Sequence, residues 1–231
     1  MNPETTTLPL VTSLEEVAAR FPAAEHAHAT ARAVAILTTA MNDGVLLPGE
    51  QLSEVRCADI LGVSRNTLRQ AFALLTASHL IEQIPNRGAF VVTPNTDQIS
   101  EMFTVRRALQ QTAISLIEPG AYPELHRVLE RARSAQKQGS VSRMALENQN
   151  FHRELVALAG SQRLDELMAS VLAEMRLLFH SMVTQPDFHG DFVEENGELL
   201  SLIEAGKRAE AQAFLDTYLR RSQAFFERHL I

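Results

Sequence analysis

The segment Ala58–Ala73, with the sequence ADILGVSRNTLRQAFA, constrains the fold of this chain more than any other stretch. A short helix ending at Leu61, a turn at Gly62–Val63 and a second helix opening at Ser64 predict a helix-turn-helix. Ser64 is a favourable N-cap, and the second helix is predicted to run to about Ser78. Its apolar residues recur at helical spacing, so one face would pack on a small core while the other carries polar side chains.

The polar face of this second helix is a candidate DNA-reading surface. Arg65 and Arg69 lie one helical turn apart, and bidentate arginine is well matched to guanine edges in the major groove. Asn66 points away from the apolar face, and the hydroxyl groups of Ser64 and Thr67 near the helix start suit phosphates or other bases. The alternative is an ordinary amphipathic surface helix, which two arginines alone do not exclude.

The residues that follow this helix predict a β-hairpin. Leu80–Ile84 and Ala89–Val92 are strand candidates, and Pro85–Gly88 between them is a tight turn. A further amphipathic helix is predicted upstream, over residues 30–42. Three helices followed by a two-stranded wing form a winged helix, in which Arg87 at the wing tip is placed to reach a minor groove or a phosphate.

The charge distribution restricts how such a domain can bind nucleic acid. The net charge of the chain is −7. Residues 27–94 contain five arginines and five acidic residues, so this segment is neutral and the acidity lies in residues 1–26 and 95–231. A DNA-binding face must therefore be a local cluster of arginines, because no basic domain surrounds it.

The chain divides into three predicted regions. Residues 1–26 are expected to be a disordered or weakly ordered lead in which Ser13 can cap a short helix, and residues 27–94 to be the winged helix-turn-helix. Residues 95–231 are expected to be entirely helical. The fold class is thus mainly α, an N-terminal winged helix-turn-helix followed by an all-α antiparallel helical bundle able to enclose a pocket. The bundle helices are predicted at residues 97–117, 122–138, 141–159, 162–183, 191–205 and 207–229.

Cysteine content and hydropathy indicate the cellular setting. The single cysteine, Cys57, excludes a disulfide framework and a multi-thiolate metal site, and we expect it to be a small core residue. No stretch approaches the roughly 18 apolar residues of a membrane helix. The first residues also lack the basic start and apolar run of a secretory signal. We therefore expect a cytoplasmic protein that does not associate with membranes.

Residues 36–91 resemble the DNA-binding domain of the GntR family of bacterial regulators. The resemblance implies that Arg65 and Arg69 read bases or anchor phosphates, with Ser64 and Thr67 on the DNA backbone. The matching positions are Gly44, Pro48, Gly49, Leu52, Glu54, Ala58, Leu61, Gly62, Val63, Ser64, Arg65, Arg69, Arg87 and Gly88.

Two positions depart from the family pattern. The family usually has an arginine that contacts DNA directly after the glutamate, where this chain has Val55, with Arg56 next to it. The glycine that usually precedes the first wing strand is replaced by His79. The operator sequence of relatives should therefore not be transferred, although Arg56 remains a candidate DNA contact.

A second resemblance begins in the segment Glu147–His152. Asn148 and His152 are four residues apart on one helix face, the spacing that two ligands of one metal would use, although a lone helix histidine is more often structural. Placed after a GntR-type winged helix, this segment resembles the FCD (FadR C-terminal) effector domain. The four metal-ligand positions of that family are Asn148, His152, Asn196 and Tyr218, so only His152 is retained. Amides and a phenol are poor partners for zinc or nickel, and we expect no bound transition metal and no other cofactor.

A cavity lined by these four side chains would still suit a small polar ligand. Arg106 matches the arginine of the family's first bundle helix and could pair with a carboxylate. Arg176 is a second candidate, although a solvated helix charge is the alternative for both arginines. The implied ligand is an organic acid bound without metal.

The sequence thus predicts a transcription regulator and not an enzyme. Two chains would form a homodimer, place their second motif helices in successive major grooves and bind a roughly palindromic double-stranded operator. An effector in the bundle would then release DNA, as expected for a repressor, although the direction of regulation is not written in the sequence. The alternatives are a metal-dependent helical-bundle enzyme and a winged-helix module that binds protein.

Overall fold

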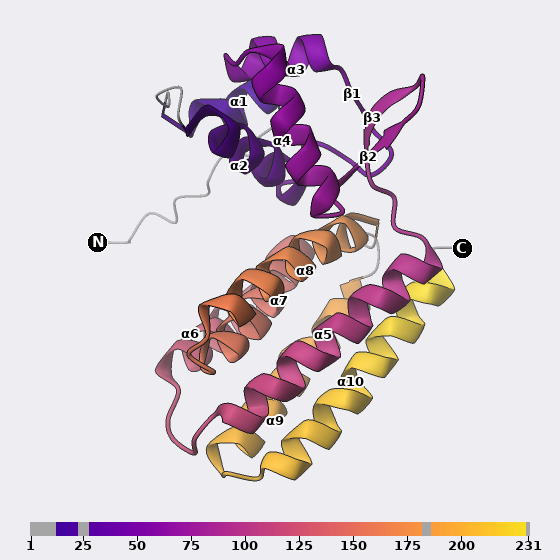
Figure 1. Ribbon diagram of the computed structural model, residues 1–231. Helices are drawn as coiled ribbons and strands as arrows, with labels where there is room; N and C mark the ends of the chain where they lie inside the picture. Colours follow the sequence, from indigo (N-terminus) through magenta and orange to yellow (C-terminus); the bar gives the residue numbers. More distant parts are fainter. Residues whose placement is uncertain (1–12, 23–27, 182–185, 230–231) are drawn as a thin grey trace. The chain divides into compact units, whose positions relative to one another are not determined.

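The computed structural model describes residues 13–22, 28–181 and 186–229, and the chain separates into two compact units, residues 1–93 and 94–231 (Figure 1). Unit 1 contains four helices and a small sheet among its described residues, and unit 2 is helical. The predicted mainly α fold, with a winged helix-turn-helix ahead of a helical bundle, is confirmed. Each unit is considered by itself below.

Unit 1 is built around the predicted motif helices. Its elements are α1 (Leu14–Ala19), α2 (Ala29–Asn42), β1 (Gln51–Leu52), α3 (Glu54–Leu61), α4 (Arg65–Ala77), β2 (Ile81–Ile84) and β3 (Gly88–Val91). α4 packs against α2 and α3 and buries the apolar face predicted from its periodicity. The buried residues of α4 are Leu68, Ala71, Phe72 and Leu75.

Local capping explains where the two motif helices begin and end. The hydroxyl oxygen of Ser53 accepts a hydrogen bond from the backbone N–H of Arg56 (3.4 Å) and starts α3. Gly62 ends α3 with φ at 65°, a left-handed conformation that glycine adopts without steric cost. Ser64 then starts α4 in the same way as Ser53 starts α3, accepting from the N–H of Thr67 (3.0 Å).

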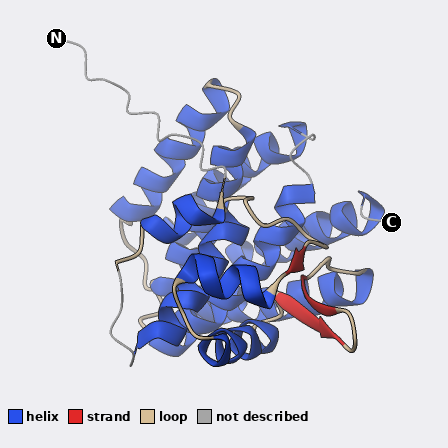
Figure 2. Cartoon of the chain, turned by 90° about the horizontal axis from the view of Figure 1, so that it is seen from above, coloured by secondary structure: helices blue, strands red, loops and turns tan. Residues whose placement is uncertain are grey.

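The wing contains one strand more than the sequence predicts. β2 and β3 form the expected antiparallel hairpin, and β1 pairs antiparallel with the other edge of β3, with Gln51 opposite Phe90 (Figure 2). β1 has only two residues, too few to show an alternating pattern, so its pairing depends on tertiary placement.

Residues 13–22 differ from the expected weakly ordered lead. Ser13 caps α1 as predicted, its hydroxyl oxygen accepting from the N–H of Glu16 (3.2 Å). The short helix is not loosely attached, because Val17 is fully buried and α1 packs against α2 and α3. Six residues are too few for a stable isolated helix, so this packing stabilises α1. Residues 1–12 and 23–27 of the predicted lead lie outside the described residues.

Unit 2 is a bundle in which α5 and α10 run side by side and α7 packs against α5, α6, α8 and α9 (Figure 1). In the part of the chain that is described, no helix is long and apolar enough to cross a membrane. The bundle helices are α5 (Thr96–Leu116), α6 (Pro123–Lys137), α7 (Val141–Ala157), α8 (Gln162–Ser181), α9 (Pro186–Glu204) and α10 (Arg208–His229).

One bundle helix begins earlier than predicted. α9 starts at Pro186, whereas the sequence predicts a break there and a helix from residue 191. Proline is tolerated in the first helical turn, where its missing N–H would have no helical partner, so Pro186 starts this helix and does not interrupt it.

Candidate DNA-reading surface and buried polar site

The outer face of α4 carries the side chains predicted to read DNA. Arg65, Asn66 and Arg69 are exposed, and Thr67 is partly buried. The hydroxyl groups of Ser64 and Thr67 lie 2.8 Å apart, so part of their hydrogen-bonding capacity stabilises the start of the helix. The structure therefore places the guanidinium and amide groups outward and uses the two hydroxyl groups locally.

Arg69 is held by a residue that sequence reasoning did not include among the site residues. Its Nε donates to Oε2 of Glu54 at 3.0 Å, linking the start of α3 to the exposed side of α4. Arg65, one turn earlier, forms no ion pair with the described residues. Glu54 and Arg69 are 15 positions apart and lie on different helices, so helical periodicity in the sequence does not relate them. Only the packing of α3 against α4 reveals this ion pair.

Two hydrogen bonds fix the backbone of Arg87 at the tip of the wing. The N–H of Arg87 donates to the carbonyl of Ile84 (3.0 Å), and its own carbonyl accepts from Nε2 of Gln51 (2.7 Å). Its guanidinium carbon lies 5.4 Å from the ring centroid of Phe90. Gly88 follows with φ at 103°, a conformation that a residue with a Cβ rarely adopts. β1 thus supports the tip through Gln51, which the sequence did not predict.

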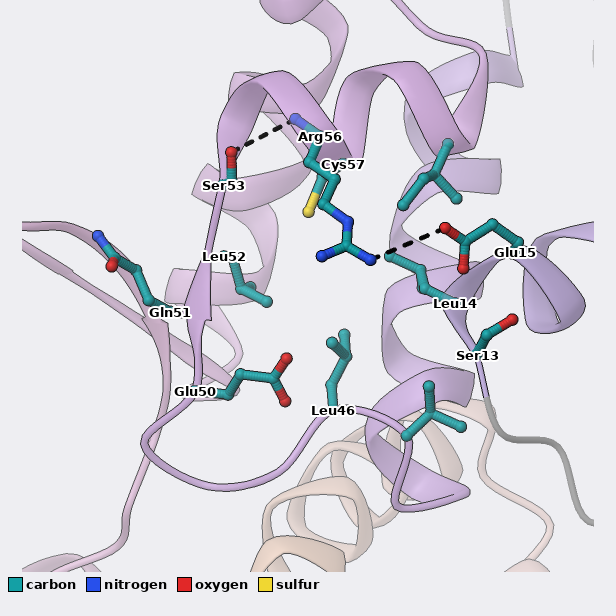
Figure 3. A pocket seen from close by; sticks show the side chains of 12 residues that line it. Ser13, Leu14, Glu15, Leu46, Glu50, Gln51, Leu52, Ser53, Arg56 and Cys57 are labelled. Carbon is teal, nitrogen blue, oxygen red and sulfur yellow. Dashed lines mark hydrogen bonds and ion pairs between the residues drawn. The ribbon is translucent and has the colours of Figure 1, made fainter.

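Arg56 lies away from this surface. Residues two apart on a helix face opposite directions, and Glu54 is already turned toward α4. The Arg56 guanidinium instead points across a pocket of about 290 Å³ toward Glu15 of α1, with Nη2 and Oε1 4.0 Å apart (Figure 3). The structure therefore does not group Arg56 with Arg69, and the DNA contact of Arg56 stays a prediction.

Unit 2 brings the predicted effector residues together from separate helices. Nε2 of His152 (α7) lies 3.0 Å from the hydroxyl of Tyr218 (α10), and that hydroxyl donates to Oδ1 of Asn148 (α7) at 3.1 Å. Nδ2 of Asn196 (α9) donates to the same Oδ1 at 2.8 Å. Gln110 (α5), which was not a predicted site residue, completes the group with Oε1 2.7 Å from Nδ1 of His152. We call these five residues, together with Arg106, the polar cluster.

Arg106 is a buried cation without a carboxylate partner among the described residues. It is 2% exposed, and Nη1 donates to the sulfur of Met175 at 3.2 Å. Burial lowers the pKa of the guanidinium, yet the intrinsic basicity of arginine keeps it charged at neutral pH. Burial, and secondarily the charge of Arg106, hold the pKa of His152 well below its ordinary value, so this imidazole is neutral.

The cluster also contains unused hydrogen-bonding capacity. Three of its buried polar atoms have no hydrogen-bond partner among the described residues: Nε of Arg106, Nε2 of Gln110 and Oδ1 of Asn196. Buried polar groups are normally paired, and leaving one unpaired costs about 1–3 kcal/mol. Two open donors and one open acceptor beside a positive charge suit a small polar anion.

Arg176 does not share the position of Arg106. It lies on α8 directly after Met175 and is only partly buried. Successive residues of a helix point about 100° apart, so Arg176 faces a different direction from the sulfur that contacts Arg106.

The residues at the family's metal-ligand positions are a poor fit to a transition metal. His152 offers the only imidazole among them, and both of its ring nitrogens already lie within hydrogen-bonding distance of Gln110 and Tyr218. Burial raises the pKa of Tyr218, which disfavours the phenolate that a metal would need. Amide groups at positions 148 and 196 supply no negative charge. No chemistry is therefore assigned to a metal here.

Comparison with known proteins agrees with this two-part architecture. Residues 29–91 match the family described as bacterial regulatory proteins, gntR family, and residues 101–221 match the FCD domain. A GntR transcriptional regulator structure from Rhodococcus sp. RHA1 is 34% identical, with a TM-score of 0.78 over 85% of this chain and 96% of that one. E. coli McbR/YncC, at 20% identity, shares the fold, with a TM-score of 0.72 over 87% of this chain and 97% of its own.

Curated relatives match a smaller part of their length. The uncharacterized HTH-type transcriptional regulator YdhC of Bacillus subtilis (strain 168) is 28% identical over 134 residues, which are 56% of this chain and 60% of that protein. The Nta operon transcriptional regulator of Aminobacter aminovorans is 28% identical over 132 residues, 56% of this chain and 63% of that protein. The chain thus spans less than two thirds of the length of these two relatives.

Proposed function

We propose, because this chain belongs to the GntR family of bacterial regulatory proteins and has an FCD domain, that it is a repressor whose DNA affinity is controlled by a small organic acid. Like the relatives that share its sequence and fold, it is a transcriptional regulator and not an enzyme. In this proposal unit 1 binds a DNA operator in the bacterial cytoplasm, and unit 2 binds the acid.

The exposed polar face of α4 is the observation that carries the DNA-binding proposal. Arg65, Asn66 and Arg69 project from a helix whose opposite face is buried, and Arg87 is held at the tip of the adjacent wing. Arginine can bind the O6 and N7 atoms of guanine in the major groove, and an exposed arginine beside it can contact a phosphate or the minor groove. In our proposal two chains pair as a homodimer, and the operator has half-sites about one helical turn apart.

The buried cation Arg106 carries the effector proposal. A charge out of water is costly unless it is paired, and among the described residues no acidic side chain pairs with it. A carboxylate bound beside Arg106 would supply the missing partner and could occupy the open donors of Arg106 and Gln110. Asn148, His152, Asn196 and Tyr218 would then orient the rest of the molecule. Because Arg106 is the only buried cation in the described part of the chain, we propose an effector with one buried carboxylate, bound without metal.

A named relative supports the direction of regulation. The HTH-type transcriptional repressor RspR of Escherichia coli (strain K12) is 28% identical over 122 residues, 51% of this chain and 54% of that protein. We propose that effector binding favours an arrangement of the dimer that binds DNA less tightly. A coupling free energy of about 1–3 kcal/mol between the two sites would suffice for this.

Operator binding is tested with duplexes selected by the protein from a random pool. The Arg69→Ala variant should bind its selected duplex about tenfold or more weakly than the parent at the same salt concentration. Arg127→Ala removes a similarly exposed arginine from α6 in unit 2 and is the matched control, whose operator affinity is expected to stay within twofold of the parent's. Equal affinity of the Arg69→Ala variant and the parent would refute the proposal.

Effector binding is tested by thermal unfolding in the presence of mono- and dicarboxylic acids, with and without a chelator. An acid present at 100 times its Kd stabilises the protein by about 2.7 kcal/mol, enough to raise the melting temperature measurably. The same acid should lower operator affinity, and Arg106→Met should abolish both effects. A melting temperature that falls on adding chelator alone would contradict metal-independent binding.

A further inference from the structure

We infer that Glu54 is a positioning residue that sets how strictly Arg69 discriminates between DNA sequences, an inference that rests on the proposed DNA-binding function. Glu54 is the first residue of α3, and its Oε2 accepts a hydrogen bond from Nε of Arg69 at 3.0 Å. The bond occupies the inner nitrogen of the guanidinium. The two outer nitrogens, Nη1 and Nη2, have no partner among the described residues.

The energetics of the pair favour orientation over stability as its role. The side chain of Arg69 is 66% exposed and that of Glu54 39% exposed. Ion pairs at this level of exposure contribute little to folding, because water screens them and two long side chains lose rotational freedom. A planar arginine held by one edge is already ordered for two parallel hydrogen bonds to a base edge. The entropy of ordering Arg69 is then lost on folding and not on binding.

The negative charge of the Glu54 carboxylate has a second effect, which is to lower the affinity for unspecific DNA. A negative charge beside the reading helix repels phosphates, and binding to unspecific sequence depends almost entirely on phosphate contacts. Glu54 therefore weakens binding to any duplex, while it improves the fit to a duplex that offers the right base to Arg69. The charge thus lowers both affinities, whereas the orientation of Arg69 widens the ratio of specific to unspecific affinity, which we call the specificity ratio. Arg65 forms no ion pair with the described residues, so its guanidinium is not oriented in this way.

Three variants separate orientation from charge. Glu54→Ala removes both the charge and the hydrogen-bond acceptor, whereas Glu54→Gln removes the charge and keeps an oxygen that can accept from Nε. Asp59→Asn is the matched control, since Asp59 lies on the same helix, is exposed and forms no ion pair with the described residues. The full-length proteins are compared by fluorescence anisotropy on the parent's selected duplex and on a scrambled duplex of the same length, at several salt concentrations.

The inference predicts a distinct pattern of affinities. Glu54→Ala should bind the scrambled duplex a few-fold more tightly and lose about tenfold of the specificity ratio, the size expected for one well-oriented base contact. Glu54→Gln should also bind the scrambled duplex more tightly and retain most of the ratio. Asp59→Asn should change the ratio by less than twofold. In an Arg69→Ala background, Glu54→Ala should cause no further loss of the ratio.

Several results would overturn the inference. One is a ratio of specific to unspecific affinity for Glu54→Ala that lies within twofold of the parent's ratio. Another is a loss of this ratio in Glu54→Ala that is no larger than the loss in Asp59→Asn. A further loss in the Arg69→Ala background would show that Glu54 acts independently of Arg69. Melting temperatures identify a variant that has lost its fold. If Glu54→Ala does not fold, Glu54→Gln tests the inference, because a lower ratio of specific to unspecific affinity in Glu54→Gln would contradict orientation by the hydrogen bond.

The parent protein separates this inference from the proposed function. If the parent itself selects no sequence, the proposed function fails together with this inference. A selective parent with an unaffected Glu54→Ala variant refutes the inference alone.

Discussion

Nη1 of Arg106 lies 3.2 Å from the sulfur of Met175, so the buried cation of the helical unit faces a thioether and not a carboxylate. A thioether is a weak hydrogen-bond acceptor and supplies no countercharge. The position therefore costs folding free energy that an ordinary hydrophobic core residue would not. The acid that we propose as effector would supply the missing countercharge and offset this cost.

Replacing Arg106 by methionine is expected to stabilise the protein while abolishing effector binding. Methionine is similar in length and needs no hydrogen-bond partners, and exchanging buried ionic groups for apolar ones can stabilise by about 1–4 kcal/mol. Urea unfolding of parent and variant measures the change. Arg107→Met, on the same helix, is the control, because Arg107 donates to Oε1 of Gln223 (2.9 Å) and is less buried. A variant of Arg106 less stable than the Arg107 control would show that the cation is well accommodated.

His152 is expected to make folding stability depend on pH below neutrality. Its pKa in the folded state is held well below the ordinary value, first by burial and then by Arg106. The unfolded chain therefore binds a proton on this group as the pH falls through about 6.5, while the folded chain does not. The stabilising contribution is complete above that pH and is lost below it, at up to about 1.4 kcal/mol per pH unit. Urea unfolding between pH 7.5 and 5 should show a shallower slope for His152→Gln than for the parent, and equal slopes would contradict a neutral buried imidazole.

His79 occupies a backbone conformation that favours glycine. It follows α4 with φ at 56°, in the left-handed region where a side chain with a Cβ is strained by about 1–2 kcal/mol. His79→Gly should therefore stabilise unit 1, by about 0.5–1 kcal/mol once the greater freedom of the unfolded chain is subtracted. Ser78→Gly is the matched control, since Ser78 has φ at −95° and gains nothing from glycine. Denaturant midpoints that move equally for the two variants would refute strain at position 79.

Cys57 is expected to be unreactive in the folded protein. Its side chain is buried, and burial raises its pKa to about 11. The thiolate is the reactive form, and at pH 8 only about 0.1% of such a thiol is ionised, compared with roughly a quarter of an unperturbed one. Labelling by a maleimide should be at least a hundredfold slower in buffer than in urea. Comparable rates would show that the packing around α3 opens readily.

The α4 region could be predicted from the sequence because its determinants are local. Ser53, Gly62 and Ser64 start and end helices through bonds to residues no more than four positions away. The spacing of the buried apolar residues then identifies which side of α4 faces outward. The same reasoning failed at β1, since a strand of two residues contains no repeating pattern. It also failed at Pro186, because a proline can mark either the start of a helix or a break between helices.

The sequence by itself thus determined the helices, the hairpin and the outward face of α4, because these depend on repeating patterns and caps within a few residues. The resemblance to known regulators indicated which side chains belong to the bundle site. Only the tertiary structure decided that Arg106 is buried with no carboxylate partner in the described part of the chain. It also decided that Gln110 joins His152, 42 positions away in the chain. It alone paired Glu54 with Arg69. Such contacts depend on which helices pack together, and neither periodicity nor a capping motif specifies a partner on another helix.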